Sequence, residues 1–228
     1  MNTSRTPPAA PPSYGLPGSV ASPTSPSSSQ TTPPTQTTQT TVRLFVAINL
    51  PDAVRQQLYD AAAPLRASAP HVSWVAPPKL HLTVKFLGEQ PPEMVEASAS
   101  ALRELAARHR PFDIELGGAG AFPNLKAPNV VWAGVVNEPR LELLHHDVEV
   151  AFQQLGCGLD GRTFRPHITL GRVRHGGGRD EAKAIARGVR LVHFSAHAHV
   201  STIEVMESVL APGGAQYEVR RSVELSKN

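Results

Sequence analysis

His81-Leu82-Thr83-Val84 and His167-Ile168-Thr169-Leu170 share one design: a histidine, an apolar residue, a threonine and a second apolar residue. Alternate side chains of an extended strand point to opposite faces, so each histidine shares a face with its threonine while the apolar pair turns to the core. The two stretches lie 86 residues apart. They predict two half-sites that face each other across a groove, and two imidazoles with two hydroxyls around one small volume suit a phosphate ester.

The composition bounds the class of protein. Of the 228 residues, 40% are hydrophobic, which is enough for one domain or a close pair of lobes. The formal net charge of +3 is mild and favours a local contact with an anionic ligand over a broad basic surface. Cys157 is the single cysteine, which excludes a disulfide framework and a cysteine-rich zinc site. With no apolar run of transmembrane length and no secretory leader pattern, we expect a cytoplasmic protein without a membrane segment.

Residues 1–41 differ in composition from the rest of the chain. They hold nine of the 22 prolines and 18 serines or threonines, with Arg5 as the single charged residue. So little apolar surface cannot offset the entropy of ordering, so we expect a disordered tail followed by a folded domain over residues 42–228. An alternative is that translation begins near Val42.

The pattern of the folded part alternates strands with helices. We predict strands over 42–50, 73–75, 80–87, 112–116, 129–136, 167–174, 192–207 and 217–225. Helices are expected over 52–65, 93–109, 140–155 and 180–187, and turns at 117–118, 176–178 and 211–214. The two halves follow a similar order, and the two His-x-Thr strands occupy matching places. The sequence therefore predicts an α+β fold of two duplicated lobes, related by a pseudo-twofold axis, that flank a central groove.

The chemistry of two such strands is that of a phosphodiester or cyclic phosphate. Hydrolysis needs one group that takes a proton from water and one that gives a proton to the leaving alkoxide, and histidine suits both roles because its ordinary pKa is about 6.5. Either histidine can be the acid on these grounds. The hydroxyls of Thr83 and Thr169 can donate to the non-bridging oxygens, and the scheme needs no metal.

A cation is expected beside the phosphate, and the candidates are Arg165, Arg172 and Lys85. Arg165 and Lys85 have the parity of the site-facing residues, although a strand lysine is more often solvated. Arg172 has the opposite parity in an unbroken strand, but Gly171 is a place for a β-bulge that would turn it toward the site.

Other motifs favour plainer interpretations. Three histidines with the same strand parity are a candidate metal site: His193, His197 and His199. No acidic partner is evident from the spacing, so we favour a strand face exposed to solvent. Phe45 suits either stacking on a nucleobase or core packing, and we favour the core.

These residues resemble a known family. The chain is similar to the 2H phosphoesterase superfamily and, within it, to the bacterial and archaeal RNA 2′,3′-cyclic phosphodiesterases, also called 2′-5′ RNA ligases. The resemblance rests on an ordered set of segments, which is far more specific than a single His-x-Thr. The matching segments are Arg43–Ile48, His81–Gly88, Val131–Gly134, Phe164–Arg172 and Glu207–Ser208.

The resemblance implies a bilobal fold with an antiparallel sheet in each lobe. It implies ring opening of an RNA terminal 2′,3′-cyclic phosphate to a 2′-phosphomonoester, and reversible 2′-5′ joining of RNA ends as a second activity. By motif, His81 becomes the proton donor to the departing 3′-oxygen and His167 the base that activates water.

In the same resemblance, Thr83, Thr169 and Arg172 hold the phosphate. Arg165 is a further candidate because of its parity. We expect a monomer that needs no cofactor and acts on RNA ends or nucleoside 2′,3′-cyclic phosphates. The alternative is a non-catalytic module that binds nucleotides or RNA ends.

Overall fold

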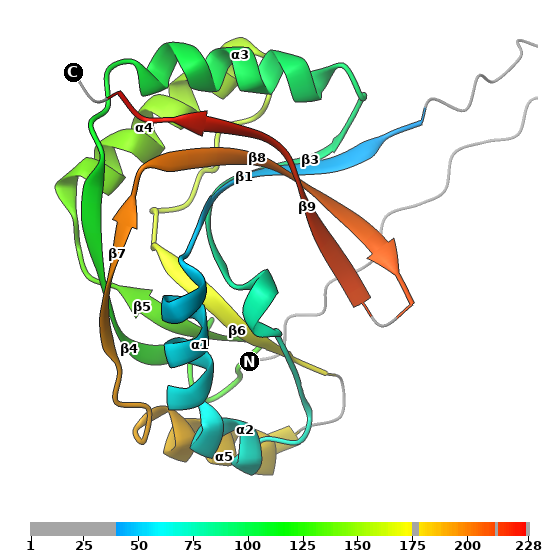
Figure 1. Cartoon of the computed structure of the whole chain (residues 1–228). Helices are drawn as coiled ribbons and strands as arrows, with labels where there is room; N and C mark the ends of the chain where they lie inside the picture. Colours follow the sequence, from blue (N-terminus) through cyan, green and yellow to red (C-terminus); the bar gives the residue numbers. More distant parts are fainter. Residues whose placement is uncertain (1–39, 175–177, 213, 227–228) are drawn as a thin grey trace, which may run out of the picture. The chain divides into compact units, whose positions relative to one another are not determined.

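One antiparallel sheet contains all the strands of the described residues, in the order β7-β4-β5-β6-β3-β1-β8-β9, with β2 paired to β6 (Figure 1). The structure is a computed structural model that describes residues 40–174, 178–212 and 214–226. The strands are β1 (Val42–Asn49), β2 (Val72–Trp74), β3 (His81–Gln90), β4 (Phe112–Phe122), β5 (Val130–Val135), β6 (His167–Val173), β7 (Ser195–Val200), β8 (Thr202–Ala211) and β9 (Gly214–Glu224).

The helices gather in two groups, one for each part of the sheet. Helices α3 and α4 pack against each other and against β3, β8 and β9, while α2 and α5 pack together and α5 contacts β4 (Figure 1). A short 3-10 helix, η1, lies beside α1. Their bounds are α1 (Asp52–Ala61), α2 (Ala63–Ser68), η1 (Pro77–Lys79), α3 (Met94–Ala106), α4 (Pro139–Gln154) and α5 (Gly178–Val189). No helix of the described residues is long and apolar enough to cross a membrane.

The predicted two-lobed fold is confirmed. From the centre outward, β3, β1, β8 and β9 form one lobe and β6, β5, β4 and β7 the other, and in each lobe the His-x-Thr strand pairs with a strand that precedes it in the chain, β3 with β1 and β6 with β5. The two lobes meet where β3 pairs with β6, with Leu82 opposite Ile168. The lobes do not coincide with the halves of the chain, because β4 from the first half belongs to the second lobe and β8 from the second half to the first.

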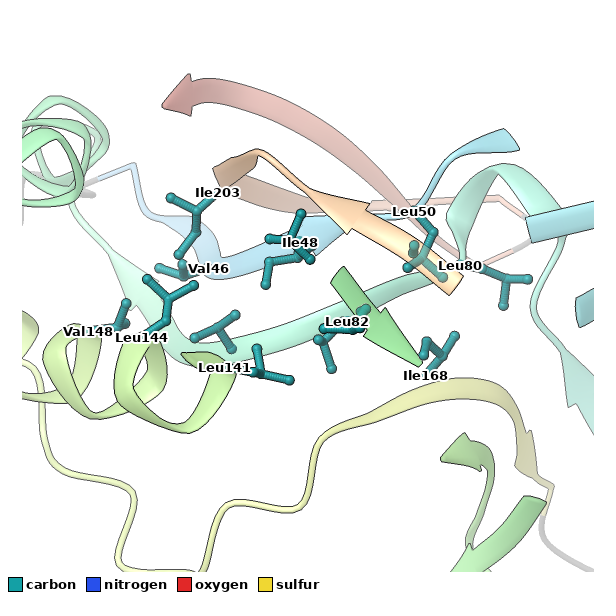
Figure 2. Close-up of a cluster of buried hydrophobic side chains, with 14 of the residues drawn as sticks. Val46, Ile48, Leu50, Leu80, Leu82, Leu141, Leu144, Val148, Ile168 and Ile203 are labelled. Carbon is teal, nitrogen blue, oxygen red and sulfur yellow. The ribbon is translucent and has the colours of Figure 1, made fainter. Parts of the chain in front are cut away.

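The apolar side of this junction is the core of the molecule. Leu82 and Ile168 are fully buried, as the alternation of both motifs requires. Figure 2 shows them in one cluster with apolar side chains of β1 and of α4, which include Ile48, Leu141 and Leu144. Burial of these side chains holds the two motif strands together and leaves the histidines and threonines on the opposite face.

Three predicted elements were wrong in their extent. The helix over 52–65 divides at Ala62, and Pro64 stands in the first turn of α2, where its missing N–H costs nothing. Strand β4 continues through the expected turn at 117–118, where Gly118 (φ +69°) forms an irregularity in the pairing with β5. The strand over 192–207 divides near Ser201 into β7 and β8, which lie in different lobes.

Two further predictions concern residues outside the described part. These are the disordered tail, of which residues 1–39 are not described, and the turn at 176–178, where the described chain resumes at Gly178. The predicted hairpin turn at 211–214 agrees with the pairing of Ala211 with Gly214 between β8 and β9.

Candidate active site

The pairing of β3 with β6 brings the two motifs together. Because Leu82 lies opposite Ile168 in an antiparallel pair, His81 lies across from Thr169 and Thr83 across from His167. Directly opposed Cβ atoms are about 5 Å apart and diagonal ones about 7–8 Å, so the two histidines occupy one diagonal of a four-residue square and the two threonines the other. Two imidazoles with this spacing can both reach one phosphate.

Each histidine is oriented by the carbonyl two residues before it. Nδ1 of His81 lies 2.8 Å from the Lys79 carbonyl oxygen, and Nδ1 of His167 lies 2.7 Å from that of Arg165. A carbonyl can only accept, so Nδ1 carries the proton in both rings and Nε2 is left for proton transfer. Aromatic edges hold the rings in place, with Tyr217 5.0 Å from His81 and Phe122 4.9 Å from His167 between ring centroids.

Both imidazoles favour the neutral form. Burial lowers the pKa of His81, and the charges of Arg172, His167 and Arg55 lower it further against the opposing effect of the Lys79 carbonyl. Burial also lowers the pKa of His167, and Arg172 acts in the same direction while the Arg165 carbonyl opposes it. The charge of Arg172 therefore reaches both rings, and the charge of a bound phosphate would raise both pKa values.

The predicted bulge before Arg172 is confirmed. Thr169 pairs with Trp132 and Gly171 with Val131, so Leu170 is an extra residue on β6. Leu170 and Gly171 are consecutively buried, and Arg172 emerges exposed on the face of His167 and Thr169. Gly171 permits this because a Cβ there would lie 2.5 Å from Cγ1 of Val72 on β2.

Strand β3 has a bulge at the matching place. Lys85 pairs with Val46 and Thr83 with Ala47, which leaves Val84 as the extra residue. The parity after Val84 is inverted, so Lys85 turns to the interior, where its exposed fraction is 3%. Its Nζ lies 2.8 Å from Oε1 of Glu149 on α4 and 2.8 Å from the Gly158 carbonyl oxygen. The expectation that Lys85 has the parity of the site-facing residues was wrong.

The same inversion exposes Phe86, which stands at the position in β3 that Arg172 has in β6. Phe86 is 67% exposed and lies 6.2 Å from Phe45 between ring centroids. Phe45 is buried, as favoured, and lies 5.1 Å from His81. An exposed aromatic ring thus stands on the face of one half-site where the other half-site has a guanidinium, and sequence parity missed it.

The remaining candidates divide in two. Thr83 and Thr169 are half-buried beside the histidines, and neither hydroxyl has a hydrogen-bond partner among the described residues, so both can bind a ligand. Arg165 precedes β6 with an exposed side chain, and it contributes its carbonyl to His167. Its charge is not among those that shift the pKa of either histidine.

His197 and His199 on β7 have acidic neighbours that their spacing in the sequence did not reveal. His199 lies across from Asp113 on β4 with Nδ1 2.8 Å from Oδ1, and His197 lies across from Glu115. This is a solvated sheet edge, as favoured. In the described parts of the chain, no three His, Cys, Asp or Glu side chains are grouped so as to hold a metal ion.

Known proteins share this arrangement. The sequence model of the family described as LigT like phosphoesterase matches residues 48–132 and 134–217, and each of these two segments contains one of the two His-x-Thr motifs. The RNA 2′,3′-cyclic phosphodiesterase of Archaeoglobus fulgidus is 33% identical over 80% of this chain and all of its own length. That of Geobacillus stearothermophilus is 36% identical over 58% of this chain, but the match spans only 42% of that protein.

The fold of this chain is also similar to that of solved structures. A crystal structure from Thermus thermophilus superposes with a TM-score of 0.69 at 31% identity, over 80% of this chain and 97% of the other. Escherichia coli LigT complexed with 3′-AMP gives 0.60 at 28% identity, over 82% and 100%. The curled antiparallel sheet and the paired His-x-Thr strands are those of a two-histidine phosphoesterase. The chain belongs to the LigT-like phosphoesterase family of the 2H superfamily.

Proposed function

We propose that this protein opens the terminal 2′,3′-cyclic phosphate of RNA to a 2′-phosphomonoester and a free 3′-hydroxyl. The observation that carries the proposal is the square of two histidines and two threonines across the β3–β6 pair. The relatives' activity supports the choice of substrate, because the Archaeoglobus protein that aligns over its whole length is an RNA 2′,3′-cyclic phosphodiesterase.

Two proton transfers complete the reaction. Nε2 of His167 takes a proton from water as the water oxygen bonds to phosphorus, and Nε2–H of His81 gives a proton to the 3′-oxygen as the P–O3′ bond breaks. His167 must therefore begin neutral and His81 protonated. Desolvation favours the neutral form of both rings, and the bound phosphate monoanion supplies the opposite charge that a protonated histidine needs. The choice of His81 as the protonated partner follows the resemblance to the family.

The phosphate is held by three further residues in this proposal. The free hydroxyls of Thr83 and Thr169 lie across the square and donate to the non-bridging oxygens, while Arg172 neutralises their charge. These oxygens gain charge as water attacks, so donors fixed by the sheet stabilise the transition state more than the ground state. Arg165 is a weaker candidate for the same role, because its side chain leads to solvent.

We also propose that the protein acts as a monomer in the cytoplasm, because every group of the site comes from one chain and the single cysteine, Cys157, is a buried free thiol. Reversible 2′-5′ joining of RNA ends would use the same groups, with a 5′-hydroxyl in place of water. The alternative function is binding of RNA ends without turnover.

Phosphorus NMR of a nucleoside 2′,3′-cyclic phosphate mixed with the protein and EDTA separates these functions. Hydrolysis should give the 2′-phosphate, and His81→Ala and His167→Ala should each lower kcat by about 10²–10⁴-fold. His193→Ala, an exposed histidine outside the site, is the matched control and should retain full activity. Full activity in the His81/His167 double variant would refute the catalytic proposal, and ligand binding without any turnover would establish the alternative.

A further inference from the structure

A cavity of about 220 Å³ opens beside His81, and neither proton transfer of the proposed reaction uses it. It lies between α1, η1, β3 and the β8–β9 hairpin. His81 forms one wall, Met206, Tyr217 and Val219 form an apolar wall, and Arg55 and Lys79 supply two positive charges. Among the described residues that line the cavity there is no carboxylate, so its charge favours an anion.

Arg55 is the better placed of the two cations. Its side chain is 18% exposed, and it is held by a donor bond of 2.9 Å from Nη1 to the Pro78 carbonyl and by an ion pair with Asp52. Asp52 is almost fully exposed, so water screens its charge strongly. Nε of Arg55 is buried without a hydrogen-bond partner among the described residues, and an unpaired buried donor gains from any acceptor that a ligand brings.

Lys79 is the second cation that lines the cavity. Its Nζ donates 2.9 Å to the carbonyl oxygen of Ala215, which ties η1 to the β8–β9 hairpin. The same residue orients the catalytic ring, since its own carbonyl accepts from Nδ1 of His81. The cavity and the proton donor are therefore built as one unit, and a ligand that spans both would be held in one register.

The chemistry of the ribose says what lies on that side of the substrate. In the proposed function His81 protonates the 3′-oxygen, and C3′ is bonded to C4′, which carries C5′ and the 5′-oxygen. The group beyond the 3′-oxygen is thus the 5′-phosphate of the terminal nucleotide. In an RNA end this group is the phosphodiester that links the terminal nucleotide to the rest of the chain.

We propose that the cavity binds this second phosphate, with Arg55 as its principal ligand and Lys79 as the second, so that the enzyme prefers polynucleotide ends to free cyclic nucleosides. The inference rests on the proposed function and on His81 as the acid. Arg55 thereby becomes a specificity-determining residue that binds the 5′ side of the terminal nucleotide and does not contact the bond that breaks. A guanidinium suits it because its planar set of donors matches two oxygens of one phosphate.

The test compares two substrates that differ only in this group: adenosine 2′,3′-cyclic phosphate with and without a 5′-phosphate. The wild-type protein should show a kcat/KM at least about tenfold higher for the 5′-phosphorylated substrate, as expected for a charge-assisted hydrogen bond. In Arg55→Gln this ratio should fall close to one, and in Arg55→Lys it should lie between the two. Arg103→Gln removes an exposed positive charge on α3 and should keep the wild-type ratio.

Arg55 also affects the pKa of His81, so Arg55→Gln can change the rate in a second way. Both substrates use His81 as the acid, and this second effect therefore cancels in the ratio of their kcat/KM values. A wild-type ratio near one, or an unchanged ratio in a folded Arg55→Gln, overturns the inference while hydrolysis itself upholds the proposed function. If neither substrate is hydrolysed, the proposed function fails. Calorimetric titration with adenosine 2′,5′-bisphosphate and adenosine 2′-phosphate then decides the cavity's role, and equal Kd values overturn the inference.

Discussion

Replacing Lys85 by methionine removes the one positive charge that faces Glu149 from β3. Lys85 is 3% exposed, Glu149 is 8% exposed, and their charged atoms lie 2.8 Å apart. Without Lys85, Glu149 is left as an unpaired charge in the interior, which lowers the free energy of unfolding by about 3–5 kcal/mol. For a folded part of this size, each kcal/mol lowers Tm by about 2–4 °C, so Lys85→Met should lower Tm by about 6–20 °C.

The double variant Lys85→Met/Glu149→Leu shows whether the charge itself causes the loss. It removes both buried charges of this pair, so it should be more stable than Lys85→Met, with a coupling of about 1–3 kcal/mol. Recovery is incomplete because the Gly158 carbonyl loses its donor and the amide of Asp160 loses the Glu149 oxygen that it donates to at 3.0 Å.

Urea denaturation followed by circular dichroism measures these differences. Lys183→Met is the matched control, because Lys183 forms an exposed pair with Asp180 on α5 and should cost under about 1 kcal/mol. A Lys85→Met protein as stable as the control would refute the reasoning, as would a double variant whose loss is the sum of the two single losses.

Two further predictions concern the approach to the phosphate. Arg172 lowers the pKa of both His81 and His167, so Arg172→Gln should raise both values and move the bell-shaped pH profile of kcat/KM to higher pH; an unmoved profile contradicts an electrostatic role. Gly171→Ala should displace β2 and the Arg172 bulge, costing about 1–3 kcal/mol in unfolding free energy and reducing kcat/KM, whereas Gly158→Ala, with open space around its Cα, should do neither. Equal stabilities of these two variants in urea would refute the packing argument.

The sequence predicted those parts of the site that depend on one strand at a time. Period-two alternation alone set the facing of His81, Thr83, His167 and Thr169, because burial of the intervening apolar residues allows no other orientation. Gly171 predicted the second bulge, since a glycine inside a strand marks a place where the backbone departs from the ladder.

The parts that were missed depend on pairing between strands. The bulge at Val84 has no glycine to mark it and arises from the register of β3 against β1. A signal was nevertheless present, because Val84 and Leu170 are 86 residues apart, as are the two histidines. If the bulge predicted in the second His-x-Thr strand is also assumed in the first, Lys85 turns inward and Phe86 outward. Arg55 offered no such signal, since only the packing of α1 beside η1 brings it to the cavity.

The pseudo-twofold leaves one question that only the unlike residues of the two half-sites can answer: which histidine is the acid. The cavity lined by Arg55 adjoins His81, and His167 does not line it. The half-site of β3 carries the exposed Phe86 at the position where the half-site of β6 carries Arg172. Because of these differences, a polar substrate has one preferred orientation. Placement of the 5′-side phosphate in that cavity assumes that His81 is the acid, so the two assignments stand or fall together, and both require that the product is the 2′-phosphate. Chromatography against authentic 2′- and 3′-phosphates of the same nucleoside distinguishes the products. A 3′-phosphate would mean that the 2′-oxygen leaves, which reverses the roles of the two histidines and removes the 5′-phosphate from the cavity beside His81.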